Sequence, residues 1–201
     1  MNINPQDILE EFFVNDTRHI VNKSSKKSVF LAIINDLEFC LSYHKRWREV
    51  ELTTDQRKKL QRILPTFAII SIFCSAVDVI ARVTNKRTPS IGENKKYFVN
   101  CAVKYYHLDN LQAQQLWQLR NSISHQYVLS KGTAVLSSGS SKIIESKPNN
   151  RWVFYLTGML STTLKVKDEI YKMLTDETES KKLKTQEYLL KSGFFYTPAE
   201  W

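Results

Sequence analysis

The spacing of apolar residues along the chain predicts helices over its first two thirds. Asn4 and Pro5 have the character of an N-cap followed by proline at the first helical position, and the apolar residues after them recur at helical spacing. A second stripe, from Phe30 to Leu41, lies within a segment long enough for six turns. The other predicted helices cover about 53–82 with a kink or break at Pro65, 93–106, 110–129 beginning after a cap at Asp109, 159–174 and 177–190.

The pattern changes to an alternation of apolar and polar residues after Gly132. The segments Thr133–Leu136, Ile143–Glu145 and Arg151–Leu156 are separated by stretches rich in serine, glycine and asparagine, which predicts a small antiparallel sheet. The expected fold is therefore mainly α, a helical bundle forming a single domain over residues 1–201. A small antiparallel β appendage, a hairpin or three-stranded insertion over 133–157, follows the helix that begins near residue 110.

The composition supports this fold and shows that the chain is basic. Only five glycines and five prolines occur in 201 residues, too few for many short strands. The 29 Lys and Arg residues exceed the 20 Asp and Glu residues, and the net charge of +9 favours polyanionic partners such as RNA. The longest apolar run, Phe67–Val77, is too short to cross a bilayer, and the first residues lack the pattern of a signal peptide. We therefore expect a soluble, cytoplasmic chain without a membrane partner.

Cysteine and histidine spacing gives no sign of a metal or cofactor. Cys40, Cys74 and Cys101 stand singly in apolar segments, as free buried thiols in a reducing compartment do. The chain contains no GxxxxGK[ST], GxGxxG or HExxH motif. The four histidines lack metal-ligand spacing; they are His19, His44, His107 and His125. No cofactor and no metal site are expected.

The predicted helix over 110–129 groups polar residues of complementary chemistry. At about 100° per residue, with Arg120 at zero, Ser124 lies near 40°, Asn121 near 100° and His125 near 140°. A neighbouring arc is apolar and is expected to face the core; it contains Leu116, Leu119, Ile123 and Tyr127. Histidine can exchange a proton near neutral pH, and arginine can stabilise a pentacovalent phosphorus, so the polar arc suits cleavage of a phosphodiester.

The segment from Arg120 to Tyr127 resembles a known family. It matches the R-N-x-x-x-H signature of HEPN-domain ribonucleases, and Tyr127 extends the match to the R-x4-H-x-Y form found in HEPN toxins. The resemblance implies a metal-independent endoribonuclease, a toxin or antiviral effector, whose site forms across a homodimer. It implies that Arg120 and His125 are the catalytic pair, that Asn121 assists them and that a nucleotidyltransferase antitoxin modifies Tyr127. The alternative is a catalytically silent HEPN module that binds RNA, nucleotide or a partner protein.

Other residues are expected to support this site. Asp78 is a carboxylate on an apolar helix that needs a donor, either Arg120 or a backbone N–H, so we assign it, with Ser124, a supporting role. Trp117 and Val128 lie within the polar arc, near 60° and 80°, and are predicted to form the dimer interface. A basic cluster is either a solvated face or an RNA contact; it consists of Arg57, Lys58, Lys59 and Arg62.

Simpler interpretations of the motif residues stay open. His125 can be a surface histidine bonded to a neighbour, and Arg120 can be only the ion-pair partner of a carboxylate. Tyr127 can be an aromatic residue at the edge of the core.

Overall fold

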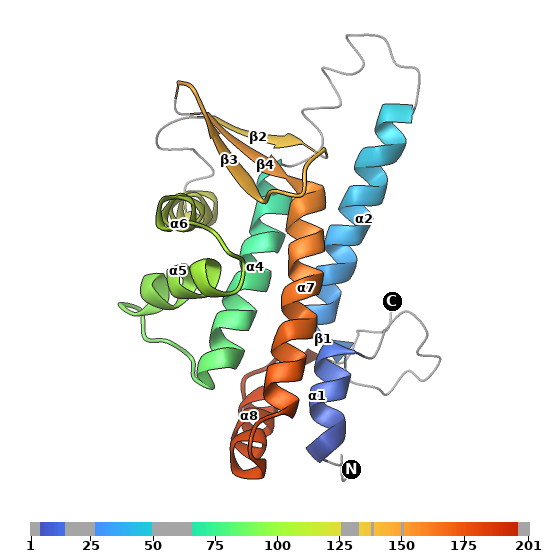
Figure 1. Cartoon of the computed structure of the whole chain (residues 1–201), viewed down its shortest axis with the longest axis vertical. Coiled ribbons are helices and arrows are strands. Elements are labelled where there is room, and N and C mark those ends of the chain that lie inside the picture. Colours follow the sequence, from blue (N-terminus) through green and yellow to red (C-terminus); the bar gives the residue numbers. More distant parts are fainter. Residues whose placement is uncertain are drawn as a thin grey trace.

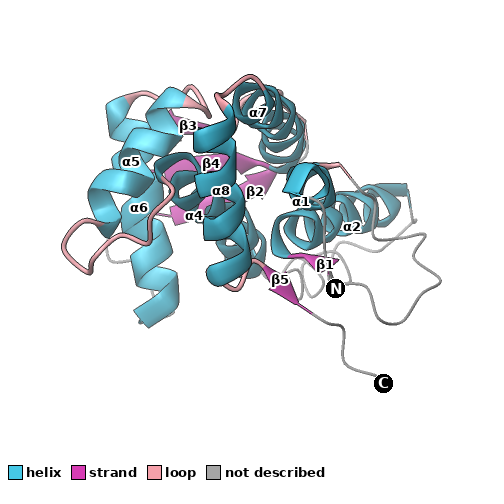
Figure 2. Cartoon of the chain, turned by 90° about the horizontal axis from the view of Figure 1, so that it is seen from below, coloured by secondary structure: helices cyan, strands magenta, loops and turns pink. Residues whose placement is uncertain are grey.

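The computed structural model describes residues 5–14, 27–49, 66–125, 133–137, 139–149 and 151–196. Three long helices, α2, α4 and α7, run side by side, and α5 and α6 pack against the side of α4 that faces away from α2 (Figure 1, Figure 2). The helices are α1 (Pro5–Phe13), α2 (Val29–Glu49), α4 (Thr66–Asn85), α5 (Asn94–Lys104), α6 (Asn110–His125), α7 (Leu156–Thr175) and α8 (Glu179–Lys191). The strands are β1 (Lys27–Ser28), β2 (Thr133–Ser137), β3 (Ile144–Lys147), β4 (Arg151–Tyr155) and β5 (Phe195–Tyr196).

The mainly helical architecture with a small β appendage is confirmed. Helix α1 begins at Pro5, as predicted, and α4 begins directly after Pro65, where the sequence predicts a kink or break. Helix α7 begins at Leu156, three residues before the predicted start, because the chain passes from β4 into the helix without a loop. The helix predicted between residue 53 and Pro65 lies outside the described residues.

The sheet that follows α6 corrects one prediction. The strand order is β2-β4-β3; β3 pairs with β4 antiparallel, as predicted, but β2 pairs with β4 parallel. The turn between β3 and β4 places Asn149 at φ 63°, a conformation that asparagine tolerates well. Alternation of apolar residues predicts strands but not their order. With β4 in the middle, β2 occupies the opposite edge from β3 and runs in the direction of β4.

A second sheet pairs β1, which directly precedes α2, with β5 near the end of the described chain. Lys27 pairs with Tyr196, and Ser28 pairs with Phe195. The buried Ser28 hydroxyl donates to the Phe12 carbonyl oxygen (2.8 Å) and accepts the Leu31 N–H (3.3 Å), so Ser28 also caps α2. This corner ties α1, α2 and the C-terminal strand together.

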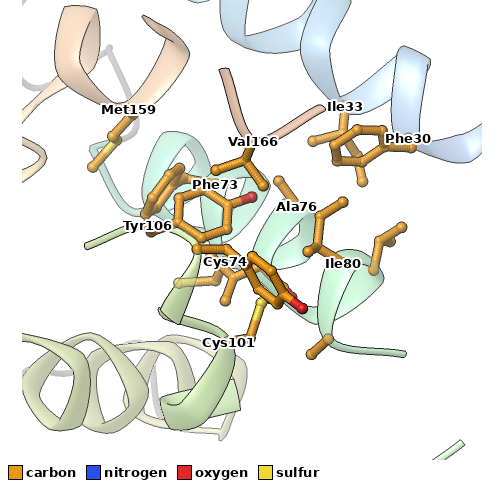
Figure 3. Close-up of a cluster of buried hydrophobic side chains, with 14 of the residues drawn as sticks. Phe30, Ile33, Phe73, Cys74, Ala76, Ile80, Cys101, Tyr106, Met159 and Val166 are labelled. Atoms are coloured by element: carbon orange, nitrogen blue, oxygen red, sulfur yellow. The ribbon is translucent and has the colours of Figure 1, made fainter. Parts of the chain in front are cut away.

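The core is continuous and rich in aromatic residues. Phe73 and Tyr106 meet edge to face at 5.4 Å in its centre, where Cys74 and Cys101 also lie (Figure 3). All three cysteines are free, as predicted. Burial raises the pKa of the Cys74 and Cys101 thiols far above the usual range, so these thiols act as packing groups rather than nucleophiles.

Helix α4 is the central element of the bundle. It contacts α2, α5, α6, α7, α8 and β2. Among the described helices it alone is long and apolar enough to meet the length and composition of a membrane span, over Ala68–Asn85. More than half of that window (56%) is buried inside the fold. The position of α4 therefore brings its single carboxylate, Asp78, next to α6.

Candidate functional site

Helix α6 is held by its start and by its apolar side. The Asp109 carboxylate accepts the Gln112 N–H (2.8 Å), and the Gln112 side-chain oxygen accepts the Asp109 N–H (3.1 Å), which forms a reciprocal capping box. Leu116 and Leu119 are buried, which confirms the apolar arc for the residues whose side chains are described. The Gln112 amide also donates to the Ile144 carbonyl oxygen of β3 (3.3 Å).

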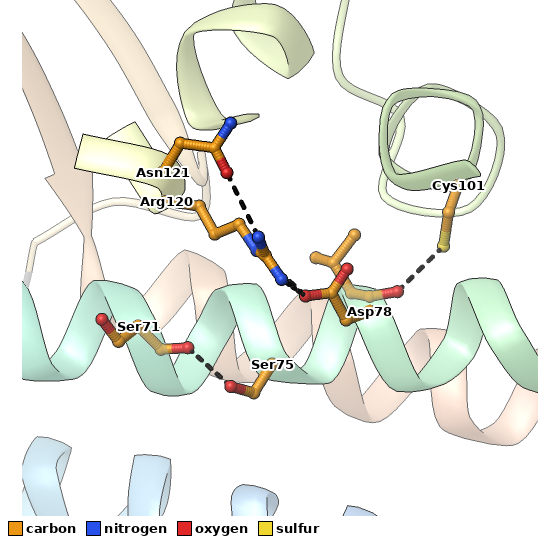
Figure 4. Close-up of polar contacts among 7 residues, drawn as sticks. Ser71, Ser75, Asp78, Cys101, Arg120 and Asn121 are labelled. Carbon is orange, nitrogen blue, oxygen red and sulfur yellow. Dashed lines mark hydrogen bonds and ion pairs between the residues drawn. The ribbon is translucent and has the colours of Figure 1, made fainter. Parts of the chain in front are cut away.

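Arg120 lies at the junction of α4 and α6. Its Nε and Nη2 both donate to Oδ2 of Asp78, at 3.1 and 2.9 Å, and its Nη1 donates to Oδ1 of Asn121 at 3.1 Å (Figure 4). Of the two donors considered for Asp78, Arg120 and a backbone N–H, the structure shows Arg120. The pairing joins residues 42 positions apart in the sequence and stabilises the packing of α6 against α4.

The hydrogen bonds of Arg120 determine which donors stay available. A guanidinium carries five N–H groups, and the contacts with Asp78 and Asn121 use three of them. Because the Asn121 oxygen faces the guanidinium, its NH₂ group points away from it (Figure 4). Two guanidinium N–H groups and one amide NH₂ have no acceptor among the described residues. Such adjacent donors can bind an oxyanion.

Burial and charge act in opposite directions on Asp78. The Asp78 side chain is 26% exposed and the Arg120 side chain 30%. Burial raises the pKa of Asp78 above its ordinary value, although the Arg120 guanidinium, and more weakly Arg82, act to lower it. The charge on Asp78 therefore depends on Arg120. Without Arg120 the carboxylate would stay partly buried, and only Arg82, whose effect is weaker, would stabilise its ionised form.

This dependence predicts a stability defect that varies with pH. We expect Arg120→Ala to lower the free energy of unfolding by about 2 kcal/mol at pH 7, because it leaves the Asp78 carboxylate uncompensated. A carboxyl with a raised folded-state pKa destabilises the fold above that pKa, and the penalty disappears as pH falls toward the unfolded-state value. Urea unfolding at pH 7 and at about pH 4.5 should show the defect shrinking in acid.

Two further variants control this experiment. The double variant Asp78→Asn with Arg120→Ala should recover most of the lost stability at pH 7, since no carboxylate remains to be compensated. Arg151→Ala removes an exposed arginine on β4 and should leave stability within about 0.5 kcal/mol of the wild type. An Arg120→Ala defect that is the same at both pH values would show that Asp78 does not cause it.

Trp117 occupies a different environment from the one expected of a pure interface residue. Its side chain is partly buried against the core, and its ring centroid is 5.3 Å from that of Phe98 on α5. The Arg120 guanidinium carbon lies 5.0 Å from the Trp117 ring centroid. Its role at a dimer interface stays a prediction, and Val128 lies outside the described residues.

Part of the predicted site cannot be placed. The backbone of α6 is described through His125, but its side chains only through Ser122, so the side chains of Ser124 and His125 lie outside the described part. Tyr127 also lies outside it. So does the whole basic cluster of Arg57, Lys58, Lys59 and Arg62. The roles predicted for these residues stay predictions.

The sheet contains a charged cluster that the sequence did not reveal. The Glu145 carboxylate accepts from Tyr155 Oη (2.8 Å) and pairs with Lys147 (2.8 Å) and Lys142 (3.0 Å). These hydrogen bonds, with the one from Lys147 the strongest, lower the pKa of Glu145 to about 2. The sequence placed Glu145 in a predicted strand, Ile143–Glu145, but did not indicate its partners. Lys142 and Glu145 also line a pocket of about 410 Å³ between the end of α5, β3 and α7; Arg120 does not line it.

The described residues contain no group of three His, Cys, Asp or Glu side chains placed to hold a metal ion. Comparisons of the chain with protein-family models, with curated proteins and with solved structures gave no match. The functional hypothesis therefore depends on the motif of α6 and on the contacts around Arg120.

Proposed function

We propose that the protein is a metal-independent endoribonuclease of the HEPN type that cleaves single-stranded RNA with Arg120, Asn121 and His125. The observation that carries the proposal is the orientation of Arg120: Asp78 binds one edge of its guanidinium, while two N–H groups and the Asn121 NH₂ have no acceptor among the described residues. These donors are suited to the non-bridging oxygens of a phosphodiester.

The reaction is an internal transfer of the phosphoryl group. The 2′-oxygen of the ribose attacks the adjacent phosphorus, its proton goes to a base, and the bond to the 5′-oxygen breaks as that oxygen receives a proton. The products are a 2′,3′-cyclic phosphate and a free 5′-hydroxyl. Arg120 and Asn121 stabilise the negative charge on the non-bridging oxygens of the pentacovalent phosphorus, and His125 exchanges the proton.

A homodimer would complete this chemistry. Base and acid act on opposite sides of the phosphorus, and a single histidine does not reach both positions at once. A two-fold-related copy of α6 would supply the second histidine. The proposed biological role is that of a toxin or antiviral effector, with a nucleotidyltransferase antitoxin acting on Tyr127.

The decisive experiment is cleavage of a single-stranded RNA in excess EDTA. We expect cleavage to persist, because none of the proposed steps needs a metal, and we expect products that end in a 2′,3′-cyclic phosphate. A matched oligonucleotide with 2′-deoxyribose at the cleaved position should stay intact, since it lacks the attacking oxygen. Loss of cleavage on chelation would refute the metal-free mechanism. Salt-sensitive RNA binding without cleavage would favour the silent module instead.

A further inference from the structure

The contact between Arg120 and Asp78 leaves the guanidinium plane free to rotate about the Asp78 carboxylate oxygen. Both Nε and Nη2 donate to the same carboxylate oxygen, Oδ2 of Asp78. Two bonds that converge on one oxygen act as a pivot, whereas a bidentate pair with two oxygens would fix the guanidinium plane. The Asn121 contact restrains the far end only in part, because it is a single bond to a neighbouring side chain. A further contact is needed to define the orientation of the plane.

Trp117 supplies that contact. It precedes Arg120 by three residues on α6, a spacing that places two side chains on the same side of a helix. The guanidinium carbon lies over the indole ring at 5.0 Å from its centroid, within the range of a cation–π interaction. The indole is itself held from a second helix, since its ring contacts that of Phe98 at 5.3 Å and Phe98 is fully buried on α5.

We infer that Trp117 is a positioning residue that restrains the Arg120 guanidinium between its own ring and the Asp78 carboxylate, so that the free N–H groups face a substrate phosphate. This role rests on the proposed function for its catalytic consequence, but the restraint itself does not. If the guanidinium is displaced, its interaction with the phosphate oxygens weakens more in the transition state than in the ground state, because negative charge develops there during the reaction. Trp117 therefore acts on turnover through Arg120 and need not touch RNA.

Nuclear magnetic resonance of arginine side chains tests the restraint without RNA. The Arg120 Nε–H signal, assigned by its loss in Arg120→Lys, should be shifted upfield by the indole and should exchange slowly with water. Trp117→Leu should abolish the upfield shift and accelerate the exchange, although the Nε–H bond to Asp78 remains, while Trp117→Phe should retain part of the shift. An Arg120 signal that Trp117→Leu leaves unchanged would overturn the inference.

Steady-state cleavage tests the consequence. Trp117→Leu should lower kcat about tenfold with KM within about twofold, and Trp117→Phe should restore most of the rate, because an aromatic face again covers the guanidinium. Trp152→Leu, at the partly buried tryptophan of β4, is the matched control and should keep the wild-type rate. Light scattering on the same samples separates positioning from the predicted interface role. An unchanged oligomeric state is expected, and a monomeric Trp117→Leu variant would overturn the inference in favour of the interface.

The outcomes distinguish the two proposals. A wild-type protein that cleaves no RNA would refute the proposed function, while the Arg120 resonance would still decide whether Trp117 restrains that side chain. An altered resonance with unchanged kcat would overturn the positioning role in catalysis. A loss of rate that Trp117→Phe does not rescue would assign Trp117 to packing alone.

Discussion

Replacing His125 with alanine is expected to slow cleavage of single-stranded RNA by at least about a hundredfold, the usual effect of removing a general acid or base. Arg120→Lys should have a comparable effect for a different reason. Lysine keeps a positive charge beside Asp78, so the fold should stay stable, but it lacks the planar fork that holds Asp78, Asn121 and a phosphate together. Initial rates in EDTA at equal concentrations of folded protein measure both effects.

A second histidine provides the control for this experiment. His107 is exposed in the loop between α5 and α6 and has φ 54°, so asparagine, which tolerates that conformation, is the appropriate replacement. His107→Asn should cleave at the wild-type rate. If His125→Ala also kept that rate, the α6 motif would not be the catalytic site, and the simpler interpretation of His125 as a surface histidine would hold.

Gly158→Ala is expected to lower the free energy of unfolding by about 3 kcal/mol or more. In an open helix the same change stabilises by up to about 1 kcal/mol, because alanine has the higher helix propensity. Here a Cβ at position 158 would lie 1.8 Å from the Lys142 carbonyl oxygen and 2.4 Å from its carbon. Backbone atoms cannot rotate away as a side chain can, so the segment that leads into β3 must move off α7.

Urea unfolding measures this effect, with Gly139→Ala as the matched control. A Cβ at Gly139 would meet no atom within 4 Å, and that substitution should change stability by less than about 0.5 kcal/mol. Equal stabilities of the two variants would show that the β appendage does not pack against α7 as described. The RNA cleavage rate of Gly158→Ala would in addition report whether the candidate site depends on that packing.

The local features of the fold could be predicted from the sequence because they depend on neighbouring residues. Proline at position 5, the capping aspartate at position 109 and the apolar face of α6 all act within one or two helical turns. The direction of β2 could not be predicted in this way. It depends on which strand occupies the middle of the sheet, and the three strands have similar alternating patterns.

The contacts of the candidate site could likewise be predicted only in part. The sequence indicated that Asp78 needs a donor, because it is a carboxylate on an apolar helix, but it left Arg120 and a backbone N–H as alternatives. The structure shows the pairing with Arg120. The contact of Trp117 with Arg120 was not predicted. Helical spacing places both residues on one side of α6, but only the packing of Phe98 against the indole shows that Trp117 faces inward.

The pairing of β1 with β5 has a consequence for how the chain folds. Lys27 and Tyr196 meet across about 170 residues, and each strand contributes only two residues. Closing so long a loop is entropically unfavourable until the helices between the strands have assembled, because the contact of Phe195 with Phe12 forms only when α1 is in place. This corner should therefore close last during folding. It should open first when the native state fluctuates, exposing Ser28 and the start of α2 before the contacts around Arg120 are disturbed.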